Sequence, residues 1–210
     1  MSIVHHPEEA LLLAYASGAA DEPVALVVAT HLALCAVCRR AVANVESAGG
    51  VLLDDATPQA VDASGLDAVL ARLDEQEQRK PVRTQGVTPE PLRSWLGGEV
   101  TDVKWRHIAG GLSDFAIMKR GRSIARLLKA TPGTYVYEHT HKGEEVTLIL
   151  TGGLTDHTGD YHRGDTQTMT DQYHVPTALP GEDCIVLAVT TAPLKFRTFS
   201  AQLFAKWKRF

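Results

Sequence analysis

The stretch GTYVYEHTHKGEEVTLILTG, residues 133–152, decides the fold of the second half of the chain. It places His139 and His141 two positions apart, with Glu145 shortly after them. In a β-strand, residues two apart point to the same face, so both imidazoles lie on one side. A turn at Lys142–Gly143 can return the Glu145 carboxylate to that side from the next strand. The pattern therefore predicts two strands that carry three potential metal ligands on one face.

The segments around this stretch have the same texture from about residue 93 onward. RSIARLLKA, EVTLILTGGLTDHTG and DCIVLAVTTAP are short, rich in β-branched residues and separated by Gly, Asp and Pro turns. This pattern predicts an all-β barrel or sandwich. The last segment, SAQLFAKWKRF, fits either a final strand or a short helix.

The first 80 residues have a helical pattern instead, and no strand pattern occurs there. A Pro followed by two acids is a favourable helix start, and a Gly a favourable helix end. Four helices are expected: from Pro7 to Gly18, from Asp21 through Leu34, from about Ala36 to Ala48 with a stop at Gly49–Gly50, and from Leu66 onward after the caps Asp62 and Ser64. The second helix is apolar on most of its surface, which indicates burial.

A second cluster of potential ligands lies in HLALCAVC, residues 31–38. Cys35 and Cys38 can grip one ion from a single turn, and His31 lies one helical turn earlier. Zinc takes four tetrahedral ligands of this kind, so a fourth is needed. His6, just before the first helix, is the preferred fourth ligand, and His5 is the alternative. Sulfur ligands favour zinc over magnesium or calcium.

Other interpretations of these residues remain open. The two cysteines fit a thioredoxin-type redox pair, although the βαβ unit that normally carries one is not visible. They also fit buried apolar cysteines, and His31 fits a core histidine with its hydrogen bonds satisfied. Cys184, in the apolar run DCIVLAV, is expected in the core, with a redox role if its thiol reaches a pocket.

Between the two halves, EQRKPVRTQGVTPEPLRS breaks all periodicity with three prolines and a glycine, which indicates a linker. The predicted division is a helical zinc-binding domain at 1–80, a linker at 81–92 and a β domain at 93–210. Residues 1–80 carry twelve acidic and five basic side chains, a net charge of −7, and the remainder carries +3. Neither half has the basic charge of a nucleic-acid-binding protein. The chain has neither an export signal nor a membrane-length apolar run, which predicts a cytoplasmic protein with reduced thiols.

The motif G-x5-H-x-H-x3-E-x6-G in residues 133–152 resembles the first motif of the cupin superfamily at every fixed position. The resemblance implies a jelly-roll barrel whose fourth ligand comes from a later strand. His174 in DQYHVP is the candidate, although it lies further from Gly164 than the usual cupin spacing, and the turn YHRGD lacks the usual proline. His157 and His162 are expected to be exposed. Three imidazoles and one carboxylate suit Zn, Mn, Fe, Ni or Cu.

An N-terminal histidine followed by H-x3-C-x2-C is similar to the zinc-containing anti-sigma domain, and the whole chain resembles the ChrR family of anti-sigma factors. The resemblance implies an α+β protein in two domains, which sequesters an extracytoplasmic-function (ECF) sigma factor. The barrel would act as sensor, with release on an oxidative signal such as singlet oxygen or a peroxide. No catalysis, nucleic acid or membrane partner is expected in this interpretation.

The alternative from another class is a cupin metalloenzyme, of dioxygenase or isomerase type, with a helical docking domain. Glu138 and Glu144 flank the histidines and would then be candidates for acid–base chemistry, although solvated surface carboxylates are the simpler interpretation. The enzyme hypothesis gives the Cys/His cluster no purpose and ranks second. A redox-regulated DNA-binding regulator is disfavoured by the acidic first domain.

Overall fold

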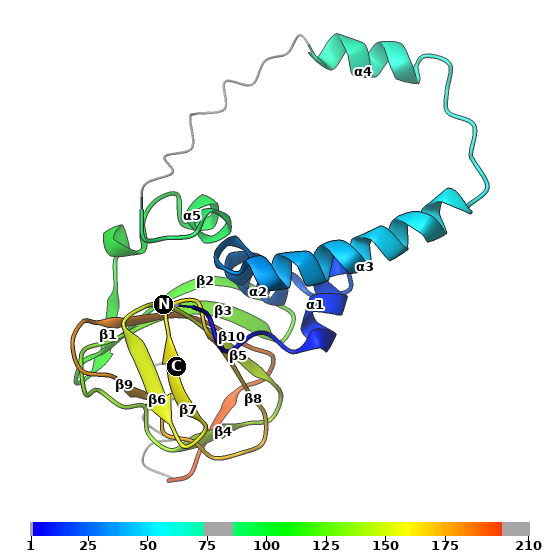
Figure 1. Cartoon of the computed structure of the whole chain (residues 1–210). Coiled ribbons are helices and arrows are strands. Elements are labelled where there is room, and N and C mark those ends of the chain that lie inside the picture. Colours follow the sequence, from blue (N-terminus) through cyan, green and yellow to red (C-terminus); the bar gives the residue numbers. More distant parts are fainter. Residues whose placement is uncertain (1, 74–85, 199–210) are drawn as a thin grey trace.

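A computed structural model describes residues 2–73 and 86–198 of the chain (Figure 1). The helices are α1 (Glu9–Ala16), α2 (Glu22–Leu34), α3 (Ala36–Asp54), α4 (Gly65–Leu73) and α5 (Glu90–Leu96), followed by a short 3-10 helix at Val100–Asp102. The strands are β1 (Arg106–Ala109), β2 (Leu112–Arg120), β3 (Ser123–Ala130), β4 (His139–His141), β5 (Glu145–Thr151), β6 (Gly153–Asp156), β7 (Gly159–His162), β8 (Thr166–Met169), β9 (Thr177–Ala178), β10 (Cys184–Thr190) and β11 (Leu194–Phe196). Described helices precede all described strands, as predicted.

The strands form a barrel of antiparallel sheets. The largest sheet has six strands in the order β1-β2-β3-β10-β5-β8, and two smaller sheets pair β7-β6-β9 and β11-β4. Strands distant in the sequence are neighbours in the large sheet, since β10 lies between β3 and β5. The predicted fold class, a helical N-terminal part followed by an all-β barrel, is confirmed.

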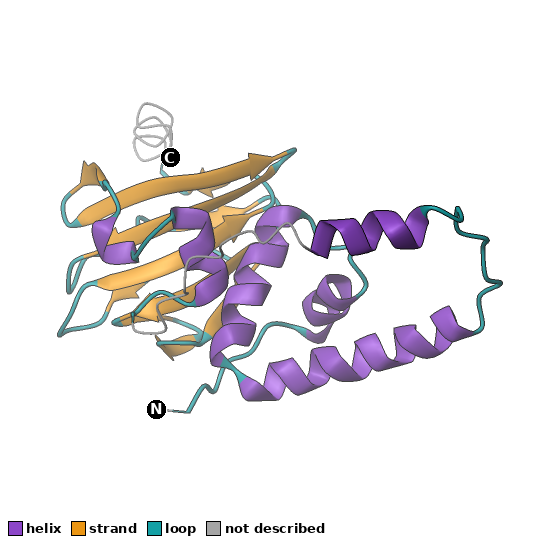
Figure 2. Ribbon diagram, turned by 90° about the horizontal axis from the view of Figure 1, so that it is seen from above, coloured by secondary structure: helices purple, strands orange, loops and turns teal. Residues whose placement is uncertain are grey.

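Both faces of the large sheet are buried. Helices cover its outer face, and its inner face lines the interior of the barrel. In β10, Ile185, Leu187 and Val189 belong to a core shared with α2, whereas Val186 and Ala188 belong to a second core inside the barrel. This double burial explains why the β5 and β10 sequences are almost continuously apolar instead of alternating. Figure 2 shows the helices gathered on one side of the strands.

The join between α2 and α3 is sharp. α2 begins at a capping Asp21, whose carboxylate accepts a 3.1 Å hydrogen bond from the Val24 N–H. α2 ends at Leu34, and Cys35 caps both this end and the start of α3, where the two helices are bent by 120°. The bend brings residues from the end of one helix and the start of the next to a common point.

One sequence expectation about helices is wrong, and one described helix was not expected. α3 was expected to stop at Gly49–Gly50 but continues to Asp54. Neither glycine adopts the positive φ that terminates a helix, and two interior glycines cost a helix only about 2 kcal/mol. α5 lies partly within the predicted linker, because Leu92 is fully buried in the shared core and stabilises a short helix there.

The predicted domain boundaries remain predictions, and the final segment SAQLFAKWKRF lies outside the described residues. Within the described residues no single helix is long and apolar enough to cross a membrane. α2 and α3 have the required length and composition only when taken together as a bent pair.

Candidate metal centres

The first candidate centre lies where α2, α3 and the N-terminal segment meet. His31 comes from the last turn of α2, Cys35 from the junction, Cys38 from the first turn of α3, and His6 from the segment before α1. One ligand atom from each of the four lies within 4.8 Å of the others. His6 Nδ1 lies 3.5 Å from Cys35 Sγ and 3.4 Å from Cys38 Sγ. The structure thus brings together the four residues named from the sequence.

These distances fit an ion between the ligands. Metal–nitrogen and metal–sulfur bonds of about 2.05 and 2.3 Å at a tetrahedral angle separate the two atoms by about 3.6 Å. His31 adds a second observation. Its Nδ1 lies 2.9 Å from the carbonyl of Gly164, whereas its buried Nε2 has no hydrogen-bond partner among the described residues. Nδ1 therefore carries the proton and donates it to the carbonyl, which leaves the Nε2 lone pair free for a metal.

Burial shifts the pKa values of two ligands in this cluster, His31 and Cys38, in opposite directions. Burial is the main cause that lowers the pKa of His31 to about 4, so the ring is neutral and can coordinate a cation. Burial, followed by the hydrogen bond with Cys35, raises the pKa of Cys38 to about 12. A divalent cation bound to the sulfur would lower this pKa again, because it stabilises the thiolate.

The second candidate centre lies inside the barrel. His139 and His141 come from β4, Glu145 from the first position of β5, and His174 from a short bridge opposite His139. All four are buried. The Nε2 atom of His174 lies 3.1 Å from that of His139 and 3.2 Å from that of His141, and His141 Nε2 lies 3.3 Å from a Glu145 oxygen. Two nitrogens bound to one ion at about 2.05 Å would lie about 3.3 Å apart.

Hydrogen bonds on the outer side of the rings set their tautomers. His139 Nδ1 donates to the Tyr137 carbonyl at 2.8 Å, and His174 Nδ1 donates to Asp156 at 3.0 Å. Both Nε2 atoms therefore face each other with lone pairs, a repulsive arrangement that a cation between them would turn into coordination. Asp156 is itself held by the side-chain amide of Gln167 at 2.9 Å.

Burial favours the neutral forms of these ligands, which suits the imidazoles for coordination but disfavours the Glu145 carboxylate. It is the largest cause that lowers the pKa of His139 to about 4 and of His141 to about 3, so both rings are neutral. It also raises the pKa of Glu145 to about 7, against the opposing effects of His174 and Arg126. The pKa of Asp156 is lowered instead. Burial acts to raise it, but hydrogen bonds from His174, Thr158 and Gln167 to the carboxylate have the larger effect.

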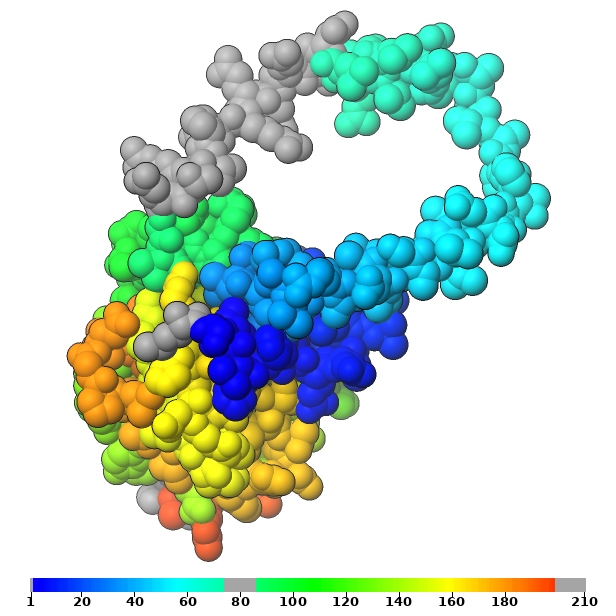
Figure 3. All heavy atoms as spheres, viewed as in Figure 1, coloured from blue at the N-terminus to red at the C-terminus, as the bar shows by residue number. Residues whose placement is uncertain are grey.

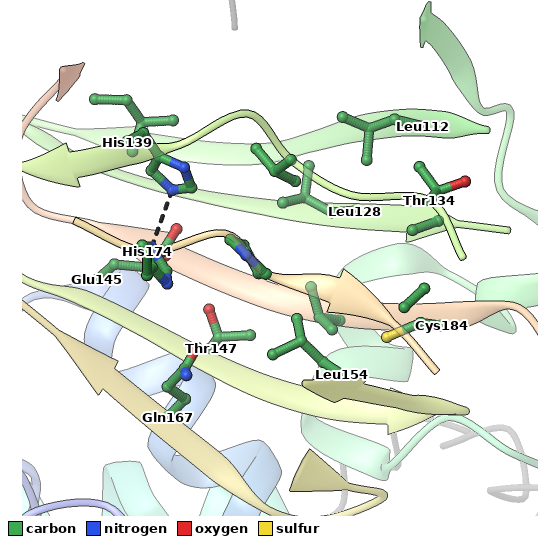
Figure 4. Close-up of a pocket in the computed structure, with 16 residues that line it drawn as sticks. Leu112, Leu128, Thr134, His139, Glu145, Thr147, Leu154, Gln167, His174 and Cys184 are labelled. Carbon is green, nitrogen blue, oxygen red and sulfur yellow. Dashed lines mark hydrogen bonds and ion pairs between the residues drawn. The ribbon is translucent and has the colours of Figure 1, made fainter. Parts of the chain in front are cut away.

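The barrel cluster opens onto a cavity of about 50 Å³. His139, Glu145 and His174 lie at one end, and Cys184 lies toward the other, beyond a wall of apolar side chains (Figure 4). Cys184 is buried, as predicted, and burial raises its pKa to about 12. The cavity is large enough for a water-sized molecule beside the ligand cluster.

The other histidines and the glutamate considered from the sequence lie outside the two clusters. His5 stays outside the first cluster, with its ring 4.5 Å from that of Tyr161. His157 and His162 are exposed, as expected. Glu138 pairs with Arg197 at 2.8 Å, which supports a surface role.

Sequence reasoning missed Asp156 and named Gly164 only as a turn residue, whereas the structure shows that they hold His174 and His31 in place. No local pattern reveals these contacts, since the partners are 18 and 133 positions apart.

The fold and the two clusters define a class: a helical Cys/His unit joined to a cupin-type barrel with a three-histidine, one-carboxylate cluster. Residues 96–194 match the family model of the ChrR cupin-like domain. The anti-sigma-E factor ChrR of Cereibacter sphaeroides is 40% identical over 206 residues, which cover 97% of each chain. A crystal structure of Rhodobacter sphaeroides SigE in complex with the anti-sigma ChrR is similar with a TM-score of 0.80 and 38% identity, and the match covers 90% of this chain and 100% of that chain. This chain belongs to the ChrR family of anti-sigma factors.

Proposed function

We propose that this protein is a cytoplasmic anti-sigma factor that sequesters an ECF sigma factor. The observation that carries the proposal is the 40% identity to an anti-sigma factor over 97% of both chains, which spans both ligand clusters. Sigma factors need exposed surfaces to bind RNA polymerase, and covering those surfaces inhibits them sterically. In this role the chain is a regulator and not an enzyme.

The helical part offers a surface suited to such a partner. The C-terminal half of α3 and all of α4 carry large apolar side chains that the rest of the described structure leaves exposed: Val51, Leu52, Leu53, Leu66, Val69, Leu70 and Leu73. No residue of α4 is buried. Figure 3 shows α3 extending away from the barrel and α4 separated from it in that view. Exposed apolar side chains gathered on two helical segments in this way are typical of a protein interface.

We further propose that zinc occupies the helical cluster through His6, His31, Cys35 and Cys38. The mixed sulfur and nitrogen donors and the N···S distances near 3.5 Å support zinc there. We propose that zinc or another divalent transition metal, such as Mn, Fe or Ni, occupies the barrel cluster through His139, His141, Glu145 and His174. Its nitrogen and oxygen donors do not select one ion.

In this proposal the barrel is the sensor, and an oxidative signal of the singlet-oxygen or peroxide type leads to release of the sigma factor. The support is its buried cluster, which opens onto a small cavity. The second candidate function, a metalloenzyme, needs room for a substrate beside the ligands, and a cavity of about 50 Å³ holds only a water-sized molecule.

The test is co-expression with an ECF sigma factor, followed by co-purification and an in vitro transcription assay. The proposal expects a stable complex and loss of sigma-dependent transcription. A chain that captures no ECF sigma factor but converts a small substrate when loaded with iron would overturn it and establish the enzyme.

A further inference from the structure

The helical cluster is not enclosed by helices alone, because a turn of the barrel touches it. Residues 163–165 lie between β7 and β8. The Gly164 carbonyl accepts the hydrogen bond that fixes His31, although the two residues are 133 positions apart. The barrel therefore supplies an outer partner to one ligand of the helical cluster.

The neighbouring residue, Asp165, holds the segment that carries another ligand. One oxygen of its buried carboxylate accepts hydrogen bonds from the backbone N–H groups of Val4 at 2.8 Å and His5 at 3.0 Å. The other oxygen accepts from the His162 N–H at 2.9 Å. Three donors thus converge on one carboxylate, which ties the N-terminal segment to the barrel immediately before His6.

Two further contacts keep the segment in register. Thr166 follows Asp165 in the sequence, and its backbone N–H donates a 3.1 Å hydrogen bond to the His5 carbonyl. Gly164 has a φ of +93°, and a Cβ there would meet the Ile3 side chain at 2.7 Å. The absence of a side chain lets the N-terminal segment approach closely. Backbone and side-chain bonds of three consecutive barrel residues therefore place His6 and His31.

We propose that Asp165 is a positioning residue of the helical metal site, acting through His6, with the Gly164 carbonyl acting through His31. The barrel thereby sets the metal affinity of the unit that binds the sigma factor. This inference rests on the metal sites proposed above. Loss of an outer-sphere partner typically weakens metal binding by about 10- to 100-fold.

The experiment titrates the metal-free full chain with Co²⁺ and then displaces it with Zn²⁺. Thiolate-to-cobalt absorption reports the helical site selectively, because the barrel cluster contains no cysteine. Asp165→Ala should weaken Co²⁺ binding at the thiolate band by about tenfold or more and leave binding at the barrel site unchanged. Asp165→Asn, which keeps an acceptor oxygen, should have a smaller effect.

The matched control is Asp160→Asn, an exposed acid on the preceding strand β7, which should behave as the parent chain. Gly164→Ala is the independent variant: the strained φ and the contact with Ile3 should displace the segment and weaken the same band. If both Asp165→Ala and Gly164→Ala bind with parent affinity and spectrum, the inference is overturned while the proposed metal site stands. If the parent chain itself shows no thiolate band, the proposed metal site and this inference both fall.

Discussion

The two ligand clusters are built in different ways. The barrel cluster takes its ligands from paired strands and one bridge, and all four are buried. The helical cluster takes one ligand from an exposed histidine in an irregular segment and three from a helix junction. Sheet hydrogen bonds position the first set, whereas the second set joins short helices, which would gain more from the proposed metal. The difference indicates a pre-organised centre in the barrel and a structural centre in the helices.

The largest expected effect comes from removing both thiols of the helical cluster. Cys35→Ala with Cys38→Ala should remove one of two bound metal equivalents and abolish sigma binding. Structural zinc contributes on the order of 10 kcal/mol in small metal-dependent domains, so the packing of α1 to α3 should loosen. Elemental analysis and co-purification measure the two results. Cys184→Ala, which removes a buried thiol outside both clusters, is the control and should keep both metals; retention of two equivalents in the double variant would contradict the assignment.

The next largest effect is expected from removing a ligand of the barrel cluster. His141→Ala or Glu145→Ala should remove the barrel metal but leave the fold and sigma binding intact, because the barrel core does not depend on an ion. Release of the sigma factor by an oxidant should be blunted. Metal content, co-purification and transcription after oxidant treatment measure these outcomes, with Glu144→Ala as the neighbouring control. Loss of sigma binding in the cluster variants would refute this division of roles.

The exposed helix α4 should contribute binding energy without contributing stability. Leu66→Asp with Leu70→Asp places two charges on one face of the helix and should weaken sigma binding about 100-fold. The thermal midpoint of the free protein should not change, since both side chains are exposed. Ala68→Asp, on the opposite face, is the control. Equal affinity of the double variant and the control, measured by titration calorimetry, would exclude α4 from the interface.

The smallest effect concerns the support of a ligand and not the ligand itself. Asp156→Asn keeps the shape of the side chain but has one acceptor oxygen where the carboxylate has two, one for His174 and Gln167 and the other for the Thr158 N–H. Metal affinity at the barrel site should fall about tenfold, with normal occupancy at saturating metal. Competition with a chromophoric chelator measures it, and Asp160→Asn serves as the control. An unchanged affinity would mean that the strands alone orient His174.

The sequence by itself determined the fold class and named the residues that converge in each cluster. It could do so because period-two and helical spacings place ligands such as His139 and His141, or Cys35 and Cys38, on one face or in one turn. It located the helix junction and the segments that form β3, β5 and β10 for the same reason. It misplaced the end of α3 and missed α5, because one depends on the φ that two glycines adopt and the other on the burial of Leu92.

Only the tertiary structure decided how the two halves meet. The hydrogen bond from His31 to the Gly164 carbonyl joins residues 133 positions apart, and those from the Val4 and His5 N–H groups to Asp165 span at least 160 positions. Packing of α2 against the large sheet likewise buries side chains that lie far apart in the chain. Such contacts leave no periodic trace in the sequence, since they depend on where the backbone carries each residue and not on its neighbours.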